Sequence, residues 1–116
     1  MADERLDSTL PAPALEQQRR AIRDGHCNLL PPAQIAPMAR VQIARDRAMA
    51  ETLAAAAQPG RTVVLVAGHG HVNPELGVPR HLPPALAVRP VVWPLPAAPA
   101  RDYCGELREQ LRKKAG

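Results

Sequence analysis

The stretch Arg61-Thr-Val-Val-Leu-Val-Ala-Gly-His-Gly-His-Val72 decides the fold that this sequence predicts. Its apolar, β-branched part, residues 63–67, contains no alternating polar residue, so it predicts a strand buried on both faces, as in a parallel sheet. Gly68 and Gly70 then let the backbone turn sharply at the carboxyl end of the strand. Because ligands of open α/β sheets bind at that edge, His69 and His71 lie where a site is expected.

The composition limits how much core the chain can build. Its 116 residues allow one small domain at most. Hydrophobic residues make up 46% of the sequence, but aromatic residues only 2%, with no Phe. Alanine buries little area, and the 14 prolines are barred from helix interiors and central strands. We therefore expect a marginal core, which points to a missing partner or a missing half.

The basic charge of the chain does not indicate a nucleic-acid partner. The net charge of +4 comes from scattered Arg and Lys residues and one cluster near the C-terminus, which comprises Arg108, Arg112, Lys113 and Lys114. The sequence has no aromatic interleaving, no zinc-finger spacing and no recognisable nucleic-acid-binding fold. We interpret the cluster as a solvated helix face and expect no nucleic acid as a partner.

The two cysteines and the N-terminus bear on cellular location. Cys27 and Cys104 form no CxxC and no zinc spacing, so each is interpreted as a small buried residue or a thiol. A disulfide between them requires an oxidising compartment. The first residues lack an apolar signal region, and no apolar run of membrane-spanning length occurs. The sequence therefore predicts no signal peptide and no membrane span, and leaves the location open.

The order of elements along the chain is helix, long helix, strand, loop, strand, helix. A sheet of only two strands cannot bury both faces of a fully apolar strand. We therefore expect an α/β fold with helices packed on a small, parallel and incomplete sheet. The expected boundaries are a loose N-terminal segment at 1–12, a partial α/β domain at 13–93, an Ala/Pro linker at 94–100 and a C-terminal helix at 101–116. Within the domain we expect helices at 14–23 and 33–57 and strands at 61–67 and 91–93.

Two polar residues interrupt the apolar stripe of the long helix. At about 100° per residue, Gln42 and Asp46 fall near the middle of the stripe that Ile35 begins. A buried carboxylate needs a partner. One interpretation is that Asp46 pairs with an arginine or caps a loop. The other is that the side chains of Gln42 and Asp46 face the same crevice as the glycine-histidine turn, residues 68–71. In the second interpretation Asp46 orients a histidine by accepting a hydrogen bond from the ring nitrogen that does not bind the ligand.

The histidines are not equivalent candidates. In an extended segment, His69 and His71 point to opposite faces, so we do not expect both to bind one ion. His71 is favoured because it continues on the side reached by the turn at Gly70, although a histidine after a strand often only bonds a loop carbonyl. His26 and His81 are interpreted as structural. The histidines fall short of a zinc-site signature, and no Ser/His/Asp set is present.

Several segments, taken together and in order, resemble the C-terminal half of a ChaN-type haem-binding domain. They are Asp24-Gly-His-Cys-Asn-Leu-Leu-Pro-Pro32, then Met38, Gln42, Arg45-Asp46 and Met49-Ala50, then Val63-Val-Leu-Val-Ala-Gly-His-Gly-His-Val72, Leu76-Gly-Val-Pro79 and Arg101-Asp-Tyr-Cys-Gly-Glu-Leu-Arg108. That family is iron-regulated and often lipoprotein. It belongs to a superfamily with TraB/Tiki and erythromycin-esterase-like proteins.

The resemblance implies haem binding within iron acquisition, with haem as cofactor and partner, and a periplasmic or outer-membrane location for family members that carry an export signal. By position, the superfamily's Arg-Asp/Asn pair falls on Arg45-Asp46, and the histidine of its glycine-rich loop falls on His71. The axial ligand is not assigned. The candidate haem-binding residues are His71, His69, Asp46, Gln42, Arg45 and Met49.

The chain also departs from the family pattern. Family domains are about twice as long, and their N-terminal half carries a Gly-Glu-x-His type motif that is absent here. We therefore expect a haem-binding module or a truncated remnant of one, completed by a homodimer or by a separately encoded N-terminal half. The alternative is a metal-dependent hydrolase-like fragment in which His71 and Asp46 bind a divalent metal. The missing motif makes an enzyme the less favoured interpretation.

Overall fold

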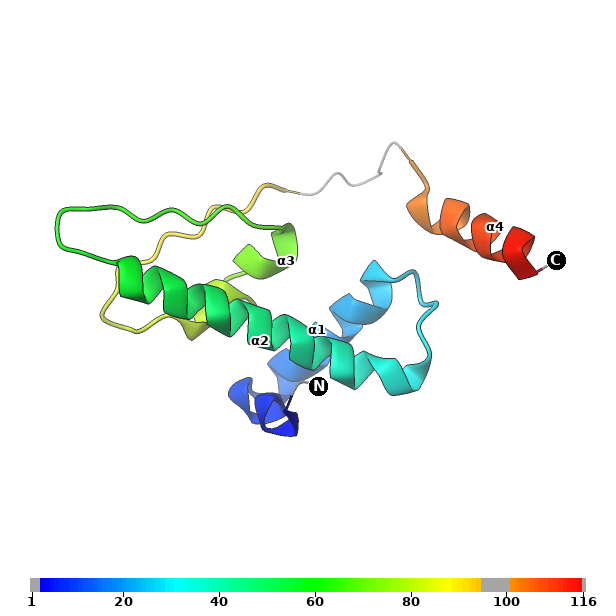
Figure 1. Ribbon diagram of the computed structural model, residues 1–116, viewed down its shortest axis with the longest axis horizontal. Coiled ribbons are helices and arrows are strands. Elements are labelled where there is room, and N and C mark those ends of the chain that lie inside the picture. Colours follow the sequence, from blue (N-terminus) through cyan, green and yellow to red (C-terminus); the bar gives the residue numbers. More distant parts are fainter. Residues whose placement is uncertain (1–2, 95–100, 116) are drawn as a thin grey trace.

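The computed structural model describes residues 3–94 and 101–115, and these residues are largely helical (Figure 1). The expected linker at 94–100 lies outside the described residues except for its first residue. In chain order the elements are the 3-10 helix η1 (Glu4–Thr9), α1 (Ala12–Gly25), α2 (Pro32–Ala56), α3 (His69–Val72), the 3-10 helix η2 (Val78–His81) and α4 (Tyr103–Ala115).

The predicted α/β fold is wrong, because the described residues form no sheet. Their β-structure is limited to one isolated antiparallel bridge between Gln58 and Arg61. Residues 62–67 and 87–94 belong to no helix or strand, and no backbone hydrogen bond joins either segment to another described part of the chain. A strand exists only where a neighbour pairs with it, so β-branched composition alone does not make a sheet.

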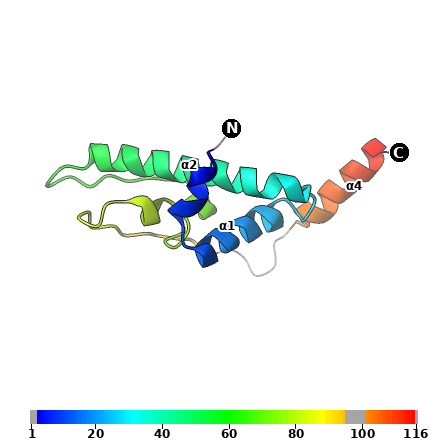
Figure 2. The same ribbon diagram turned by 90° about the horizontal axis from the view of Figure 1, so that it is seen from below.

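The long helix α2 carries the core. Its buried residues recur every three or four positions, which confirms the stripe predicted from the sequence; they are Ile35, Ala39, Ile43, Asp46 and Ala50. Figure 2 shows α1 and the segment that contains α3 and η2 on the same side of α2. Leu10, Leu76 and Val78 complete the buried apolar set. The core is therefore one layer of short elements laid along one long helix.

This core is small for the length of the chain. Seven apolar residues are buried in the described part, and two of them are alanines. The radius of gyration is 16.7 Å, whereas a compact domain of this length has a radius of about 13 Å. Most of the exposed valines and the single Trp lie on the extended segments instead of in a core. The expectation that alanine-rich composition gives little burial matches what the structure shows.

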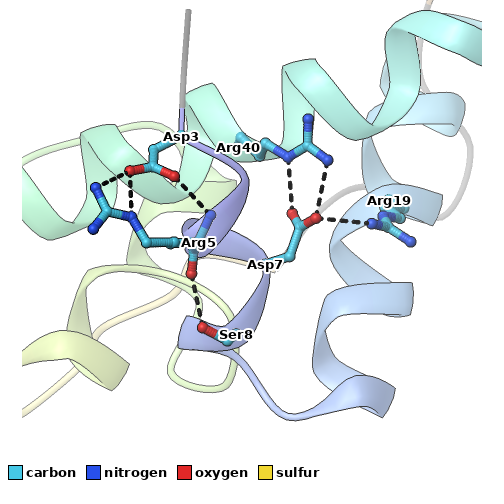
Figure 3. Close-up of polar contacts among 6 residues, drawn as sticks. All are labelled: Asp3, Arg5, Asp7, Ser8, Arg19 and Arg40. Atoms are coloured by element: carbon cyan, nitrogen blue, oxygen red, sulfur yellow. Dashed lines mark hydrogen bonds and ion pairs between the residues drawn. The ribbon is translucent and has the colours of Figure 1, made fainter.

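The N-terminal helix η1, which the sequence pattern does not predict, is anchored through polar contacts (Figure 3). The Asp3 side chain accepts a hydrogen bond from the Arg5 backbone N–H at 2.9 Å and caps the helix. The Asp7 carboxylate accepts from Nε and Nη2 of Arg40 at 3.1 and 3.0 Å, and Arg19 lies 3.6 Å away. The Arg40 guanidinium holds the pKa of the Asp7 carboxyl below its ordinary value. Residues 3–9 are therefore tied to α2.

A disulfide between Cys27 and Cys104 fastens α4 to the turn after α1, with 5.3 Å between the two Cα atoms. Cys27 and Asn28 have positive φ angles of 58° and 60° in that turn. Nη2 of Arg108 also donates to the Cys27 carbonyl at 3.3 Å. No described residue of α4 is buried. The attachment of α4 is thus covalent and polar, and a bond of this kind persists in oxidising compartments.

Replacing Cys104 with Ser should release α4 without unfolding the rest. A disulfide that closes a loop of this length stabilises a fold by about 4.5 kcal/mol, provided that the native structure holds the two cysteine positions together even without the bond. Here α4 is not buried, so loss of the bond gives it conformational freedom in the native state as well as in the unfolded state. We expect the free energy of unfolding of the α1–α2 body to fall by less than about 1 kcal/mol. Urea titration measures it, and proteolysis at Arg112 should become faster.

Candidate functional site

The glycine-histidine turn is helical, not extended. Residues His69–Val72 form the single turn α3, in which the His71 backbone N–H donates to the Gly68 carbonyl at 3.0 Å. Residues two apart on a helix diverge by about 200°, so the two histidines still point in different directions. His71 is half-buried against α2, whereas His69 is exposed. The preference for His71 over His69 as a site residue remains a prediction, and this placement supports it.

His71 meets the two polar residues of the α2 stripe. Its Nδ1 lies 2.6 Å from Oδ1 of Asp46 and 3.1 Å from Nε2 of Gln42. The Asp46 side chain is fully buried, while that of His71 keeps 23% of its surface exposed. The structure therefore brings together three of the predicted candidates in one hydrogen-bonded cluster, which we call the Gln42–Asp46–His71 cluster.

The contacts of Nδ1 set the tautomer of His71. A ring nitrogen of a neutral imidazole either donates or accepts, so Nδ1 cannot donate to Asp46 and accept from Gln42. The contact with the carboxylate is shorter and charge-assisted, so we assign the proton to Nδ1 and the donated bond to Asp46. The Gln42 amide then turns its oxygen toward the same N–H, since amide oxygen and nitrogen exchange by a half-turn.

This assignment leaves Nε2 of His71 as a nitrogen with a free lone pair. Within residues 3–94 and 101–115, Nε2 has no hydrogen-bond partner and is not among the buried unpartnered atoms. A neutral imidazole with its Nδ1–H on a carboxylate is the form in which histidine binds metals. The cluster is therefore built to present one nitrogen ligand.

Asp46 is held in the core at an energetic cost. Burial raises the pKa of its carboxyl above the ordinary value of 3.8, and the hydrogen bond from His71 opposes that rise. Its second oxygen, Oδ2, is buried and has no partner among the described residues. A buried carboxylate with one good hydrogen bond and one bare oxygen destabilises the fold relative to an apolar residue. Such costs concentrate at functional sites.

The loop after α3 leaves no room for a side chain at Gly77. A Cβ there would lie 2.7 Å from the carbonyl carbon of His71 and 2.8 Å from the carbonyl oxygen of Gly70. Oδ1 of Asn73 accepts the backbone N–H groups of Glu75 and Leu76 at 2.8 and 3.1 Å, which forms the tight turn. The sequence pattern does not predict this role for Gly77. The only available sign was a glycine three residues beyond an Asn-Pro turn.

An apolar groove lies between α2 and the extended segment that leads to α3. Its volume is about 350 Å³, and its lining residues are Ala48, Met49, Thr52, Leu53, Ala56, Val63, Val64 and Leu65. Met49 and Leu53 follow Asp46 on the same side of α2, at three- and four-residue steps. The groove therefore continues the face of α2 on which the cluster lies, toward the C-terminal end of the helix.

The remaining candidate residues lie apart from the cluster. Arg45 is exposed on α2, and no hydrogen bond joins it to His71 in the described chain. One ring nitrogen of His26 contacts the Ile22 carbonyl at 2.7 Å, as in helix termination. Burial, with Arg47 and Arg80 nearby, lowers the pKa of His81. No group of three His, Cys, Asp or Glu residues in residues 3–94 and 101–115 is arranged to bind a metal ion.

Gly77→Ala tests the close approach at the loop. The added Cβ pushes on the backbone of α3, so we expect the free energy of unfolding to fall by about 1–3 kcal/mol. Gly25→Ala is the matched control, because nothing lies within 4 Å of its Cβ position. That variant should be unchanged or more stable by about 0.5 kcal/mol. Equal urea midpoints for the two variants would contradict this packing.

Asp46→Asn tests the cost of the buried charge. The folded-state pKa of Asp46 is raised, so the wild type loses stability as the pH rises through the window above 3.8. We expect the Asn variant to be the more stable at neutral pH, with the advantage shrinking as the pH falls toward 4. Asp7→Asn should instead lower the stability at neutral pH, because Arg40 lowers the pKa of the Asp7 carboxyl. Thermal melts across this pH range measure both.

The helices of the chain and its comparison with known proteins both bear on this geometry. No helix in the described chain is both long and apolar enough to cross a membrane. No curated protein and no solved structure gave a significant match. A family model described as "Haem-binding uptake, Tiki superfamily, ChaN" matches residues 2–82, which include all three members of the Gln42–Asp46–His71 cluster. The chain therefore belongs to this haem-binding uptake family, ChaN, of the Tiki superfamily.

Proposed function

We propose that this protein binds haem through Nε2 of His71, with Asp46 as the carboxylate that orients the ring. The observation that carries the proposal is the 2.6 Å contact between Nδ1 of His71 and the fully buried Asp46. That contact fixes the ring and leaves Nε2 as the ligating atom. Membership of a haem-binding family supports the identity of the ligand.

The donor chemistry of the cluster fits haem. Haem iron accepts a neutral imidazole nitrogen at its axial position. A carboxylate hydrogen-bonded to the other ring nitrogen increases the basicity of the ligand and keeps the ring from rotating. Gln42 adds a second polar contact to the same ring edge, so the orientation of His71 rests on two residues of one rigid helix.

The apolar groove supplies a wall for the macrocycle. Met49, Leu53 and Leu65 line it, and Met49 was a predicted haem contact. We propose that Arg45, an exposed cation on α2, pairs with a haem carboxylate. At about 350 Å³ the groove is at the low end of ligand-pocket volumes. It covers one side of a haem, and we propose that a second polypeptide covers the other.

The wider role that we propose is haem or iron uptake outside the cytoplasm. The family description supports uptake. The Cys27–Cys104 disulfide is compatible with an oxidising compartment. A metal-dependent hydrolase is not proposed, because a catalytic metal site needs about three protein ligands, and the described residues offer no third one beside His71 and Asp46.

Titration with haemin tests the proposal. The oxidised full-length chain should give a saturable Soret band, and His71→Ala should lower the affinity by about tenfold or more. His69→Ala is the matched control, since His69 is an exposed neighbour on the same helical turn. It should bind as the wild type does.

Asp46→Asn separates orientation from ligation. An amide accepts the Nδ1–H bond but carries no charge, so the imidazole becomes a weaker donor to iron. We expect the Soret band to persist, with an affinity reduced by about tenfold and a higher reduction potential of the bound haem. The proposal fails if His71→Ala binds haemin as tightly as His69→Ala, or if no variant shows saturable binding at micromolar protein.

A further inference from the structure

The extended segment at residues 62–67 carries apolar side chains on both of its sides. Val63 and Leu65 line the groove with α2. Val64 also borders the groove but stays 75% exposed, and Val66 lies outside the lining and is 91% exposed. Figure 1 shows this segment running back along α2 from the C-terminal end of that helix to α3. The protein therefore covers this segment only in part, and Val64 and Val66 keep most of their surface open.

The backbone of this segment is also bare. No hydrogen bond within the described chain involves a backbone N–H or C=O group of residues 62–67. A segment of six β-branched and apolar residues has the length of an average strand. An extended backbone with unpaired polar groups and exposed valines is a template for pairing with another strand.

A second extended segment, residues 88–93, has the same properties. Val91 and Trp93 are 66% and 71% exposed, and their backbone groups are unpaired within the described chain. Pro90 has no N–H to donate, which is tolerated at the edge of a sheet. Together the exposed side chains of the two segments offer several hundred Å² of apolar surface, on the order of the ~800 Å² that each partner brings to a standard interface.

The charges around these segments all have one sign. Arg61 directly precedes the first segment and Arg89 lies within the second, and both are exposed. Between residues 52 and 101 the sequence contains one acidic residue, Glu75. A partner bound to these two segments therefore lies next to cationic side chains and almost no carboxylate. Charge complementarity calls for an acidic partner.

We propose that residues 62–67 and 88–93 accept β-strands from a different polypeptide, whose strands are flanked by carboxylates. Among the possible occupants, a polypeptide strand can hydrogen-bond to both the N–H and the C=O groups along the segment, which a lipid surface or a haem cannot do. A second copy of this chain offers strands, but the same face would set Arg61 and Arg89 against cations. This proposal does not depend on haem binding.

Synthetic peptides added to the oxidised full-length chain test the proposal. The probe has a Thr/Val alternating core of eight residues with two Asp at each end, and its matched control has Lys in place of Asp. Trp93, the single tryptophan, reports binding by a blue shift of its emission. Hydrogen exchange of amides 62–67 reports strand pairing. We expect about tenfold protection by the Asp peptide, and about tenfold weaker binding of the Lys peptide at low salt.

A pair of surface variants makes the test specific. Val66→Lys should abolish peptide binding, and since this side chain is 91% exposed, the fold should not change. Val41→Lys, at an exposed site of α2, should bind as the wild type does. The proposal is overturned if both peptides protect equally, or if neither protects. It is also overturned if the chain alone sediments as a dimer with protected amides, or if phosphatidylglycerol vesicles without peptide shift Trp93 emission and protect these amides.

Discussion

The placement of one carboxylate on the core face of α2 determines how the rest of the chain is arranged. Asp46 has no exposed surface, and an unpartnered carboxylate there would cost several kcal/mol. Its partner His71 is 25 residues further along the chain. Residues 57–68 must therefore run back along α2, α3 must turn the ring inward, and Gly77 must be small enough to pass the carbonyl of His71. The loop geometry follows from satisfying that one group.

The parts of this arrangement that depend on local periodicity could be predicted from the sequence. The 3.6-residue repeat of α2 identified the buried stripe and placed Gln42 and Asp46 in it. The choice of His71 over His69 as a site residue stays a prediction, which the contact of His71 with Asp46 supports. The sheet was predicted wrongly because sheet formation depends on contacts between segments that are distant in the sequence. Residues 63–67 have the composition of a strand, but a ladder depends on a second segment arriving in register. The Cys27–Cys104 bond likewise joins positions 77 residues apart, which spacing alone does not select.

The low burial of this alanine-rich chain explains how its outer elements are attached. Within residues 3–94 and 101–115, two of the seven buried apolar residues are alanines, so the core gains little from buried area. The N-terminal helix η1 is held by the bidentate contact of Arg40 with Asp7 instead, and α4 by a disulfide. Polar and covalent contacts fix the position of an element without requiring it to contribute apolar surface. They leave the groove face of α2 and the extended segments open for ligands.

The haem and strand proposals share one structural element, and this has a thermodynamic consequence. Residues 62–67 form one wall of the apolar groove through Val63, Val64 and Leu65, and they leave Val66 and their backbone groups open to a partner. A strand partner that orders this segment lowers the entropic cost of closing the groove on a ligand, and a ligand in the groove lowers the cost of strand pairing. Linkage requires the two effects on affinity to be equal. Coupling between partner and ligand thus follows from the shared wall and needs no contact between them.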